Sequence, residues 1–166
     1  AQVRDSRIGP RTSVWASVIE ESEVAEDVQI GPYSHVRPGC RIGPRCRIGN
    51  YAELKKANVG AGMQQHHFSY LGDAEIGDEV NIGAGAITAN YDGFVKSRTK
   101  IGDGARISVD TTLVAPVEVG DSAYTGAGSV ITEDVPPGAL GITRSEQANV
   151  EGYAERKAAK AKERAE

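Results

Sequence analysis

The chain is poor in the bulky side chains that fill most globular cores. Its 166 residues include two Phe, one Trp, one Met and two Cys, against 20 Gly. This composition favours a repetitive solenoid over a core built from aromatic rings, and the length suits one domain. The sequence contains no apolar run of membrane-spanning length, and no charged-then-apolar leader precedes the first repeat. We therefore expect a soluble cytoplasmic protein that does not bind membranes.

An excess of basic charge is also lacking. The formal net charge is −4, which gives the chain no overall attraction to nucleic acid. The two cysteines, Cys40 and Cys46, occupy the same position of successive repeats, where a small inward-facing residue is expected. A disulfide would need adjacent faces of one coil to approach closely, and a two-Cys metal site would lack partners. We favour two inward-facing thiols.

What the sequence does contain is one six-residue phrase, repeated from Val24 onward. The phrase is an aliphatic residue, usually Gly, two variable positions, a small residue and one variable position, as in Ile42-Gly43-Pro44-Arg45-Cys46-Arg47. A six-residue period is typical of a parallel β-helix, in which each repeat is a short strand and a corner and the coils bury their interior by stacking. The aliphatic residue then points inward, and Gly in the second position is expected to supply unusual backbone angles.

Two interruptions break this period, and interruptions of a scaffold are where function is most often located. The first lies between Leu54 and Ile76, and the second between Ile82 and Ile101. Both are polar and aromatic. We expect both to leave the regular coil as excursions.

The C-terminal part of the chain follows a different pattern. The repeats stop at Pro136-Pro137-Gly138, so we expect a β-helix domain over residues 1–138 and a separate segment over residues 139–166. Residues 146–166 are rich in Ala, Glu, Lys and Arg, which predicts a helix. Its few apolar residues predict docking near Tyr153 and a fraying end beyond.

One histidine of the first interruption is a candidate catalytic base. A neutral imidazole can take a proton from an attacking amine or hydroxyl near pH 7, and His67 lies just before the repeats resume. Adjacent residues of an extended chain point to opposite sides, so His66 should not share its role. A surface histidine without function is the alternative. The spacing of His35, His66 and His67 is wrong for a three-histidine zinc site, so we predict no metal.

Basic and small residues add two further hypotheses. Arg37, Lys55 and Lys96 lie in or beside the interruptions and could clamp a phosphate, although such residues are usually plain surface. Small side chains at Gly83-Ala84-Gly85 and Gly126-Ala127-Gly128 would leave a groove for a long, thin ligand such as a pantetheine arm.

These residues also resemble a known family. The motifs that carry the resemblance are Arg37-Pro38-Gly39, Ile48-Gly49-Asn50-Tyr51-Ala52-Glu53-Leu54-Lys55, His67-Phe68-Ser69-Tyr70-Leu71-Gly72-Asp73-Ala74, Val80-Asn81-Ile82-Gly83-Ala84-Gly85, Ala89-Asn90-Tyr91-Asp92-Gly93 and Leu113-Val114-Ala115-Pro116-Val117. Together they resemble the C-terminal acetyltransferase domain of the bifunctional bacterial N-acetylglucosamine-1-phosphate uridyltransferase/glucosamine-1-phosphate acetyltransferases. The resemblance implies an all-β, left-handed parallel β-helix with a C-terminal helical tail, assembled as a homotrimer with sites between subunits.

The same resemblance implies the chemistry and the residues that perform it. It implies transfer of the acetyl group of acetyl-CoA to the amine of glucosamine 1-phosphate, with catalytic residues His67, the general base, and Asn90. It implies that the amino-sugar phosphate is held by Arg37, Lys55, Tyr70, Asn81 and Lys96. Along acetyl-CoA it implies Ala84, Asn90, Tyr91, Val109, Ala127 and Arg144.

Several positions depart from the usual family motif. Ser108-Val109 stands where Gly-Ser is usual, Val95 where Asn is usual, and residues 63–66 differ from the usual approach to the histidine. These departures leave two alternatives open. One is an acyltransferase with a different acyl donor or acceptor. The other is a trimeric scaffold, engineered or diverged from this family, whose activity is altered or lost.

Overall fold

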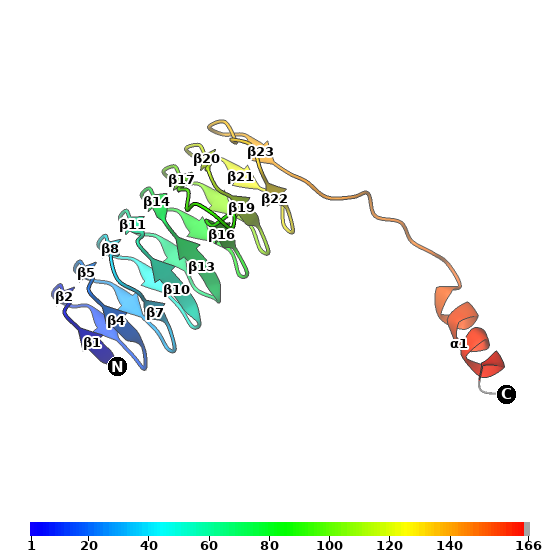
Figure 1. Ribbon diagram of the computed structural model, residues 1–166, viewed down its shortest axis with the longest axis horizontal. Coiled ribbons are helices and arrows are strands. Elements are labelled where there is room, and N and C mark those ends of the chain that lie inside the picture. Colours follow the sequence, from blue (N-terminus) through cyan, green and yellow to red (C-terminus); the bar gives the residue numbers. More distant parts are fainter. Residues whose placement is uncertain (165–166) are drawn as a thin grey trace.

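The protein is a long triangular solenoid of short parallel strands that ends in an extended tail and one helix (Figure 1). This is seen in a computed structural model, which describes residues 1–164. The strands alternate among three faces, so that every third strand stacks on the same sheet. The predicted parallel β-helix with a C-terminal helix is confirmed.

Each face of the solenoid is one parallel sheet, here called sheets A, B and C. Sheet A contains β1 (Gln2–Arg4), β4 (Val18–Glu20), β7 (His35–Val36), β10 (Ala52–Lys55), β13 (Ser69–Gly72), β16 (Ile87–Ala89), β19 (Thr112–Val114) and β22 (Val130–Ile131). Sheet B contains β2 (Arg7–Ile8), β5 (Glu23–Val24), β8 (Arg41–Ile42), β11 (Asn58–Val59), β14 (Ala74–Ile76), β17 (Thr99–Ile101) and β20 (Val117–Val119). Sheet C contains β3 (Ser13–Val14), β6 (Gln29–Ile30), β9 (Arg47–Ile48), β12 (Gln64–Gln65), β15 (Asn81–Ile82), β18 (Arg106–Ile107), β21 (Tyr124–Thr125) and β23 (Leu140–Gly141).

The aliphatic residue of each repeat fills the interior, as predicted. Ile30, Ile48, Ile107 and Ile131 are all buried, and they belong to one continuous core that runs the length of the solenoid. Cys40 and Cys46 are buried as free thiols. Burial raises the pKa of both thiols, which keeps them protonated and unreactive.

The segment between Leu54 and Ile76 is not an excursion, and that expectation was wrong. It continues the coils through β11, β12 and β13, with Val59, Gln65 and Leu71 buried at successive inward positions. The period was obscured because two of the repeats here have five residues instead of six. In addition, Gln65 takes an inward place that is usually aliphatic.

The second interruption is a real loop. Ile76 of β14 pairs with Ile101 of β17, and the coil that joins them takes 25 residues, whereas other coils take 16, 17 or 18. The additional residues form the loop between β16 and β17, which we call the site loop (residues 90–98).

Glycine in the second position of the repeat mostly has a different role from the one expected; Gly31, with φ 110, is the exception. Gly77 and Gly102 are not in the left-handed region; that conformation lies two positions later, at Glu79 and Gly104. A Cβ on Gly77 would instead overlap the Asp103 carboxylate of the next coil. That carboxylate accepts the Asp78 N–H at 2.8 Å. Close stacking of coils, and not an unusual φ, therefore selects glycine here.

The C-terminal tail is less helical than expected and does not dock on its own solenoid. After β23 the chain runs extended to helix α1 (Tyr153–Glu163), which lies away from the β-helix (Figure 1). The helix begins late because Gly152 has φ 65. It buries no residue, and Tyr153 is 56% exposed, so the expected docking is not seen in the single chain. Residues 165 and 166 of the predicted helix lie outside the described residues. Within residues 1–164 no helix has the length and hydropathy of a membrane span.

Candidate active site

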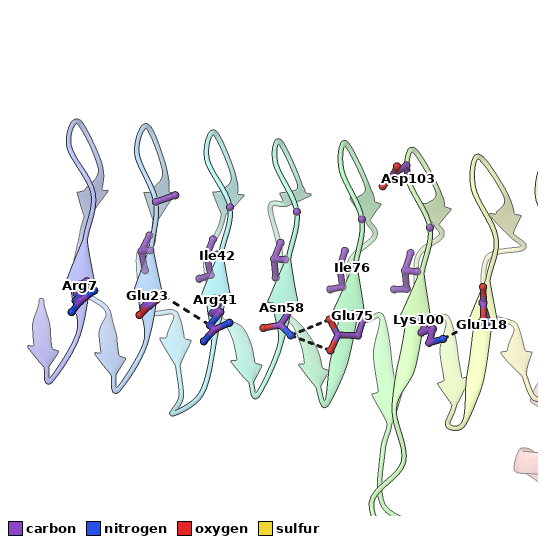
Figure 2. Close-up of a pocket in the computed structure, with 18 residues that line it drawn as sticks. Arg7, Glu23, Arg41, Ile42, Asn58, Glu75, Ile76, Lys100, Asp103 and Glu118 are labelled. Atoms are coloured by element: carbon purple, nitrogen blue, oxygen red, sulfur yellow. Dashed lines mark hydrogen bonds and ion pairs between the residues drawn. The ribbon is translucent and has the colours of Figure 1, made fainter.

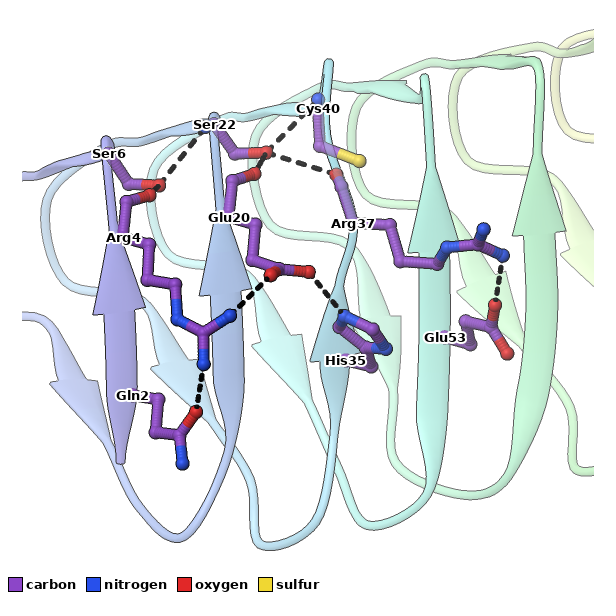
Figure 3. Close-up of polar contacts among 9 residues, drawn as sticks. All are labelled: Gln2, Arg4, Ser6, Glu20, Ser22, His35, Arg37, Cys40 and Glu53. Carbon is purple, nitrogen blue, oxygen red and sulfur yellow. Dashed lines mark hydrogen bonds and ion pairs between the residues drawn. The ribbon is translucent and has the colours of Figure 1, made fainter.

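The outward side of sheet A carries two polar clusters at its N-terminal end (Figure 3). In the first, Glu20 lies between Arg4 and His35, and its carboxylate contacts the His35 imidazole at 2.9 Å. The hydrogen bond from His35 is the main cause that holds the pKa of Glu20 below its usual range. His35, on β7, is therefore engaged with the Glu20 carboxylate on β4, which leaves it unsuited to act as a base elsewhere.

The other two histidines lie together at a corner. His66 and His67 separate β12 from β13, and both are exposed because corner residues do not alternate as strand residues do. The His66 ring contacts Gln64 Oε1 at 2.9 Å. In the part of the chain that the structure describes, His67 is the histidine whose ring makes no hydrogen bond. Among the same residues, no three His, Cys, Asp or Glu side chains could hold a metal ion.

The three predicted phosphate-binding cations gather at the edge between sheets A and B. Arg37 directly follows β7, Lys55 ends β10, and Lys96 comes from the site loop. Lys96 and then Arg37 lower the pKa of Lys55, because positive charges nearby disfavour its charged form. Arg37 also donates a hydrogen bond to Glu53 Oε1 at 2.8 Å (Figure 3). Glu53 already neutralises part of the Arg37 charge, and what remains at this edge is the repulsion of Lys55 by its cationic neighbours, which an anion would relieve.

Tyr70 and Asn90 meet beside these cations. The Asn90 Nδ2 amide lies 3.5 Å from Tyr70 Oη and donates a 2.6 Å hydrogen bond to Asp73 Oδ2. Gly72 makes the meeting possible, because a Cβ there would overlap both the Tyr70 ring and the Asn90 amide. Since a carboxylate only accepts hydrogen bonds, Asp73 holds the Asn90 amide with its nitrogen toward the carboxylate. This leaves Asn90 Oδ1 to accept a hydrogen bond from a ligand.

The site loop is held by its own hydrogen bonds. Asp92 Oδ1 accepts the backbone N–H groups of Phe94 and Val95, at 2.8 and 2.7 Å, and these bonds lower the pKa of Asp92. Tyr91 forms an antiparallel bridge with Lys96, and its hydroxyl donates to the Gly93 carbonyl at 2.6 Å. The loop is thus a small hairpin that places Lys96 next to Lys55. The hydroxyl of Tyr91 is hydrogen-bonded within the loop itself.

Three of the residues predicted along acetyl-CoA line the opposite edge, between sheets C and A. Ala84, Val109 and Ala127 follow β15, β18 and β21, and none of them is buried. The coils are close here, because a Cβ on Gly83 would overlap the backbone of Ser108 and Val109. The N–H of Ser108 donates to Thr125 Oγ1 at 2.9 Å. The Ser108 backbone is thus hydrogen-bonded to the next coil, although Ser replaces the usual Gly.

Two predicted residues lie apart from both groups. Asn81 is on the outward side of sheet C, where it pairs with Gln64, and Arg144 is exposed in the extended tail. The structure therefore brings together Arg37, Lys55, Tyr70, Asn90, Tyr91 and Lys96 at one edge of sheet A, and His67, Ala84, Val109 and Ala127 at the other. Three residue steps of β13 separate these edges, which is about 10 Å at the rise of a β-strand.

Sheet B carries a groove of about 800 Å³, which none of the predicted site residues lines. Its outward residues alternate in charge along the solenoid (Figure 2): Arg7, Glu23, Arg41, Asn58, Glu75, Lys100 and Glu118. They contact one another, as in the 3.0 Å bonds from Asn58 to both Glu75 oxygens and the 3.9 Å pair of Lys100 with Glu118. A face whose charges are already paired offers no net attraction for a phosphate, so sheet A remains the candidate site.

Sequence reasoning missed Gly72 and Asp73, although both belong to a motif that it quoted. The available signal was a Gly-Asp pair at the end of a strand, which is a common sign of a corner. The signal did not show which side chain the carboxylate would meet, because Asn90 lies in the next coil.

Comparison with known proteins shows what the chain is similar to. Residues 21–56 match the model of the bacterial transferase hexapeptide, which comprises six repeats. The chain is 50% identical to the bifunctional protein GlmU of Synechococcus sp. (strain CC9605) over 155 residues, and 52% identical to that of Listeria monocytogenes serotype 4a (strain HCC23) over 154 residues. Each match covers 93% of this chain but 34% of the relative. The chain thus spans about a third of the length of these relatives, at their C-terminal part.

Solved structures share the fold at lower identity. The acetyltransferase domain of PglB from Neisseria gonorrhoeae FA1090, in complex with acetyl coenzyme A, matches with a TM-score of 0.64 and 23% identity over 74% of this chain and 58% of that one. A mutant of perosamine N-acetyltransferase from Caulobacter crescentus, in complex with CoA and GDP-perosamine, matches with a TM-score of 0.63 and 18% identity over 75% and 57%. At these identities the likeness shows the fold alone.

Proposed function

Because this chain is a homologue of the C-terminal part of GlmU proteins, we propose that it transfers the acetyl group of acetyl-CoA to the amine of glucosamine 1-phosphate. The relatives at about 50% identity and the hexapeptide repeats support an acetyltransferase. The single observation that carries the acceptor is the cluster of Arg37, Lys55 and Lys96, whose mutual repulsion lowers the pKa of Lys55.

In this proposal the cationic cluster holds the phosphate of the amino sugar. A phosphate dianion between three cations forms charge-assisted hydrogen bonds and removes their repulsion. Tyr70 and the free Oδ1 of Asn90 lie beside that position. They can hydrogen-bond the sugar hydroxyls and the incoming amine.

His67 acts as the general base. Its neutral imidazole takes a proton as the amine attacks the thioester carbonyl, so that the carbon–nitrogen bond forms. The carbon–sulfur bond then breaks, and the CoA thiolate leaves and takes up a proton. The low groove along Ala84 and Ala127 would accommodate the pantetheine arm, because these side chains rise little above the backbone, and the larger Val109 borders it.

The two edges of sheet A are farther apart than one small sugar readily spans. This separation supports a trimer with shared sites. In such an assembly the His67 edge of one subunit faces the cationic cluster of the next. The edge that holds His67 also carries a row of exposed aromatic residues, which we call the aromatic edge: Trp15, Tyr33, Tyr51 and Phe68. Tyr33 and Tyr51 stack at 5.5 Å, and Phe94 at the tip of the site loop is 94% exposed. Exposed apolar surface of this extent is typical of protein interfaces.

The test is a thiol-release assay with acetyl-CoA and glucosamine 1-phosphate, with glucosamine as the acceptor that lacks phosphate. We expect the phosphorylated sugar to be preferred. His67→Ala should reduce kcat roughly 10²- to 10⁴-fold, whereas the matched variant His66→Ala should change it little. If the two variants lose activity equally, the base is misassigned. If the wild-type protein releases no thiol with either acceptor, the proposed reaction is wrong, and the two alternatives remain: a different acyl donor or acceptor, or a scaffold without activity.

A further inference from the structure

A polar side chain lies inside the solenoid at a place that the repeat reserves for aliphatic residues. Gln65 is the inward residue of β12, with no exposed surface, and it stacks on Ile48 of β9. Its Oε1 atom is buried without a hydrogen-bond partner. A buried carbonyl oxygen without a partner is destabilising. Its presence next to the candidate base therefore requires an explanation.

The other end of the Gln65 amide provides one. Its Nε2 atom donates a 2.7 Å hydrogen bond to Ser69 Oγ, and the Ser69 hydroxyl donates to the His67 carbonyl at 3.1 Å. Gln65 and Ser69 flank the two-histidine corner from β12 and β13. The buried amide is thus connected through one hydroxyl to the backbone of His67.

The direction of these bonds matters. The amide nitrogen can only donate, so the hydroxyl accepts from Gln65 and its own proton is directed to the His67 carbonyl. This fixes the peptide group that follows His67. The backbone orientation at His67 then limits the directions in which the exposed imidazole can point.

We propose that Gln65 is a positioning residue for His67, acting through Ser69. The proposal deepens the proposed function and rests on His67 being the base. An aliphatic residue at position 65 would suit the interior better, so the chain keeps Gln65 for the corner and not for the core. Such an opposition between stability and activity is a known feature of functional sites.

The test replaces Gln65 by apolar residues of similar size, in the full chain. Gln65→Leu restores the residue type of the repeat, and Gln65→Met keeps the unbranched shape in case the branched side chain does not fit. We expect an equal or higher Tm and a kcat lower by about ten- to a hundredfold, since small misplacements of a catalytic group cost that much. The KM for glucosamine 1-phosphate should change little, because the cationic cluster is at the other edge.

Ser69→Ala should reproduce the loss of kcat, and combining it with Gln65→Leu should add little, because both break one chain of hydrogen bonds. Ile19→Val is the matched control: it leaves a small cavity in the same core, three coils away, and should lower Tm without changing kcat. A Gln65→Leu variant with unchanged kcat, or with kcat and Tm reduced together as in an ordinary core defect, would overturn the proposal.

An NMR measurement separates this proposal from the proposed function. The chain has three histidines, so their ring signals can be assigned by substitution. We expect the His67 signals to shift or broaden in Gln65→Leu, while those of His35 stay in place. If the wild-type protein proves inactive but His67 alone responds, the positioning holds and the assigned reaction fails. If His67 does not respond, the positioning fails whatever the activity.

Discussion

Asp73→Asn tests whether the Asp73 carboxylate sets the orientation of the Asn90 amide. The substitution keeps the size of the side chain, and Asn tolerates the left-handed backbone at this position, where φ is 49. What changes is the 2.6 Å bond that Asp73 Oδ2 accepts from Asn90. It becomes a neutral hydrogen bond, and a competing orientation of either amide becomes possible.

The magnitude follows from the two kinds of bond. A hydrogen bond to a charged group contributes about 1.5–3 kcal/mol and a neutral one about 0.5–1.5 kcal/mol, so the change is about 1–1.5 kcal/mol. If Asn90 contacts the reacting groups, kcat should fall about five- to tenfold. The KM for glucosamine 1-phosphate should stay level or decrease, because removing a negative charge beside Lys55 strengthens the attraction for phosphate.

Steady-state kinetics on both substrates measures this, with Asp27→Asn as the matched control. Asp27 has the same backbone conformation, with φ 59, and its carboxylate pairs with Arg11 near the N-terminal end. The control should lower stability slightly and leave kcat unchanged. An Asp73→Asn variant that raises KM tenfold at constant kcat would refute the reasoning, because Asp73 would then serve phosphate binding.

Three other expectations concern the edges of sheet A. Lys96→Ala should raise the pKa of Lys55, measured by NMR titration, because the charge of Lys96 is the main cause that lowers this pKa. The same variant should raise KM for the phosphorylated acceptor by about tenfold and leave KM for the unphosphorylated sugar unchanged. Ser108→Gly combined with Val109→Ser should tighten acetyl-CoA binding by roughly 0.5–1.5 kcal/mol in calorimetry, and an unchanged affinity would place the groove elsewhere. Phe94→Ser should shift the proposed trimer toward monomers in sedimentation at micromolar concentration, whereas a monomeric wild-type protein would exclude the shared site.

The fold could be predicted from the sequence because the interior is nearly one-dimensional. Each inward position, such as Ile48 or Ile107, sees only its own coil and its two neighbours, so a local period determines its place. The same logic failed between Leu54 and Ile76. There a polar Gln65 took an inward place, and a hydrophobic pattern has no means to identify a buried amide whose partner, Ser69, lies in the next strand.

The candidate site was predictable in its residue types but not in its arrangement. The cations could be named because their chemistry suits a phosphate, whatever the fold. Their separation from His67 across sheet A could not be predicted, because it depends on the corner at which each repeat ends. The role of Asp73 was invisible for a similar reason: its partner Asn90 is 17 residues away along the chain and becomes a neighbour only through coil stacking.

The unequal lengths of the coils have a consequence for how such a protein can change. The coil that contains the site loop takes 25 residues where the coils on either side take 17 and 18, and it still stacks in register on both sides. Closing the longer loop costs only about 0.3 kcal/mol more in chain entropy. Insertions and deletions at this corner are therefore nearly neutral for folding. The segment that presents Asn90 and Lys96 can be lengthened, shortened or exchanged without any compensating change in the core. Under the proposed function, acceptor specificity is then the property of this molecule that is easiest to alter.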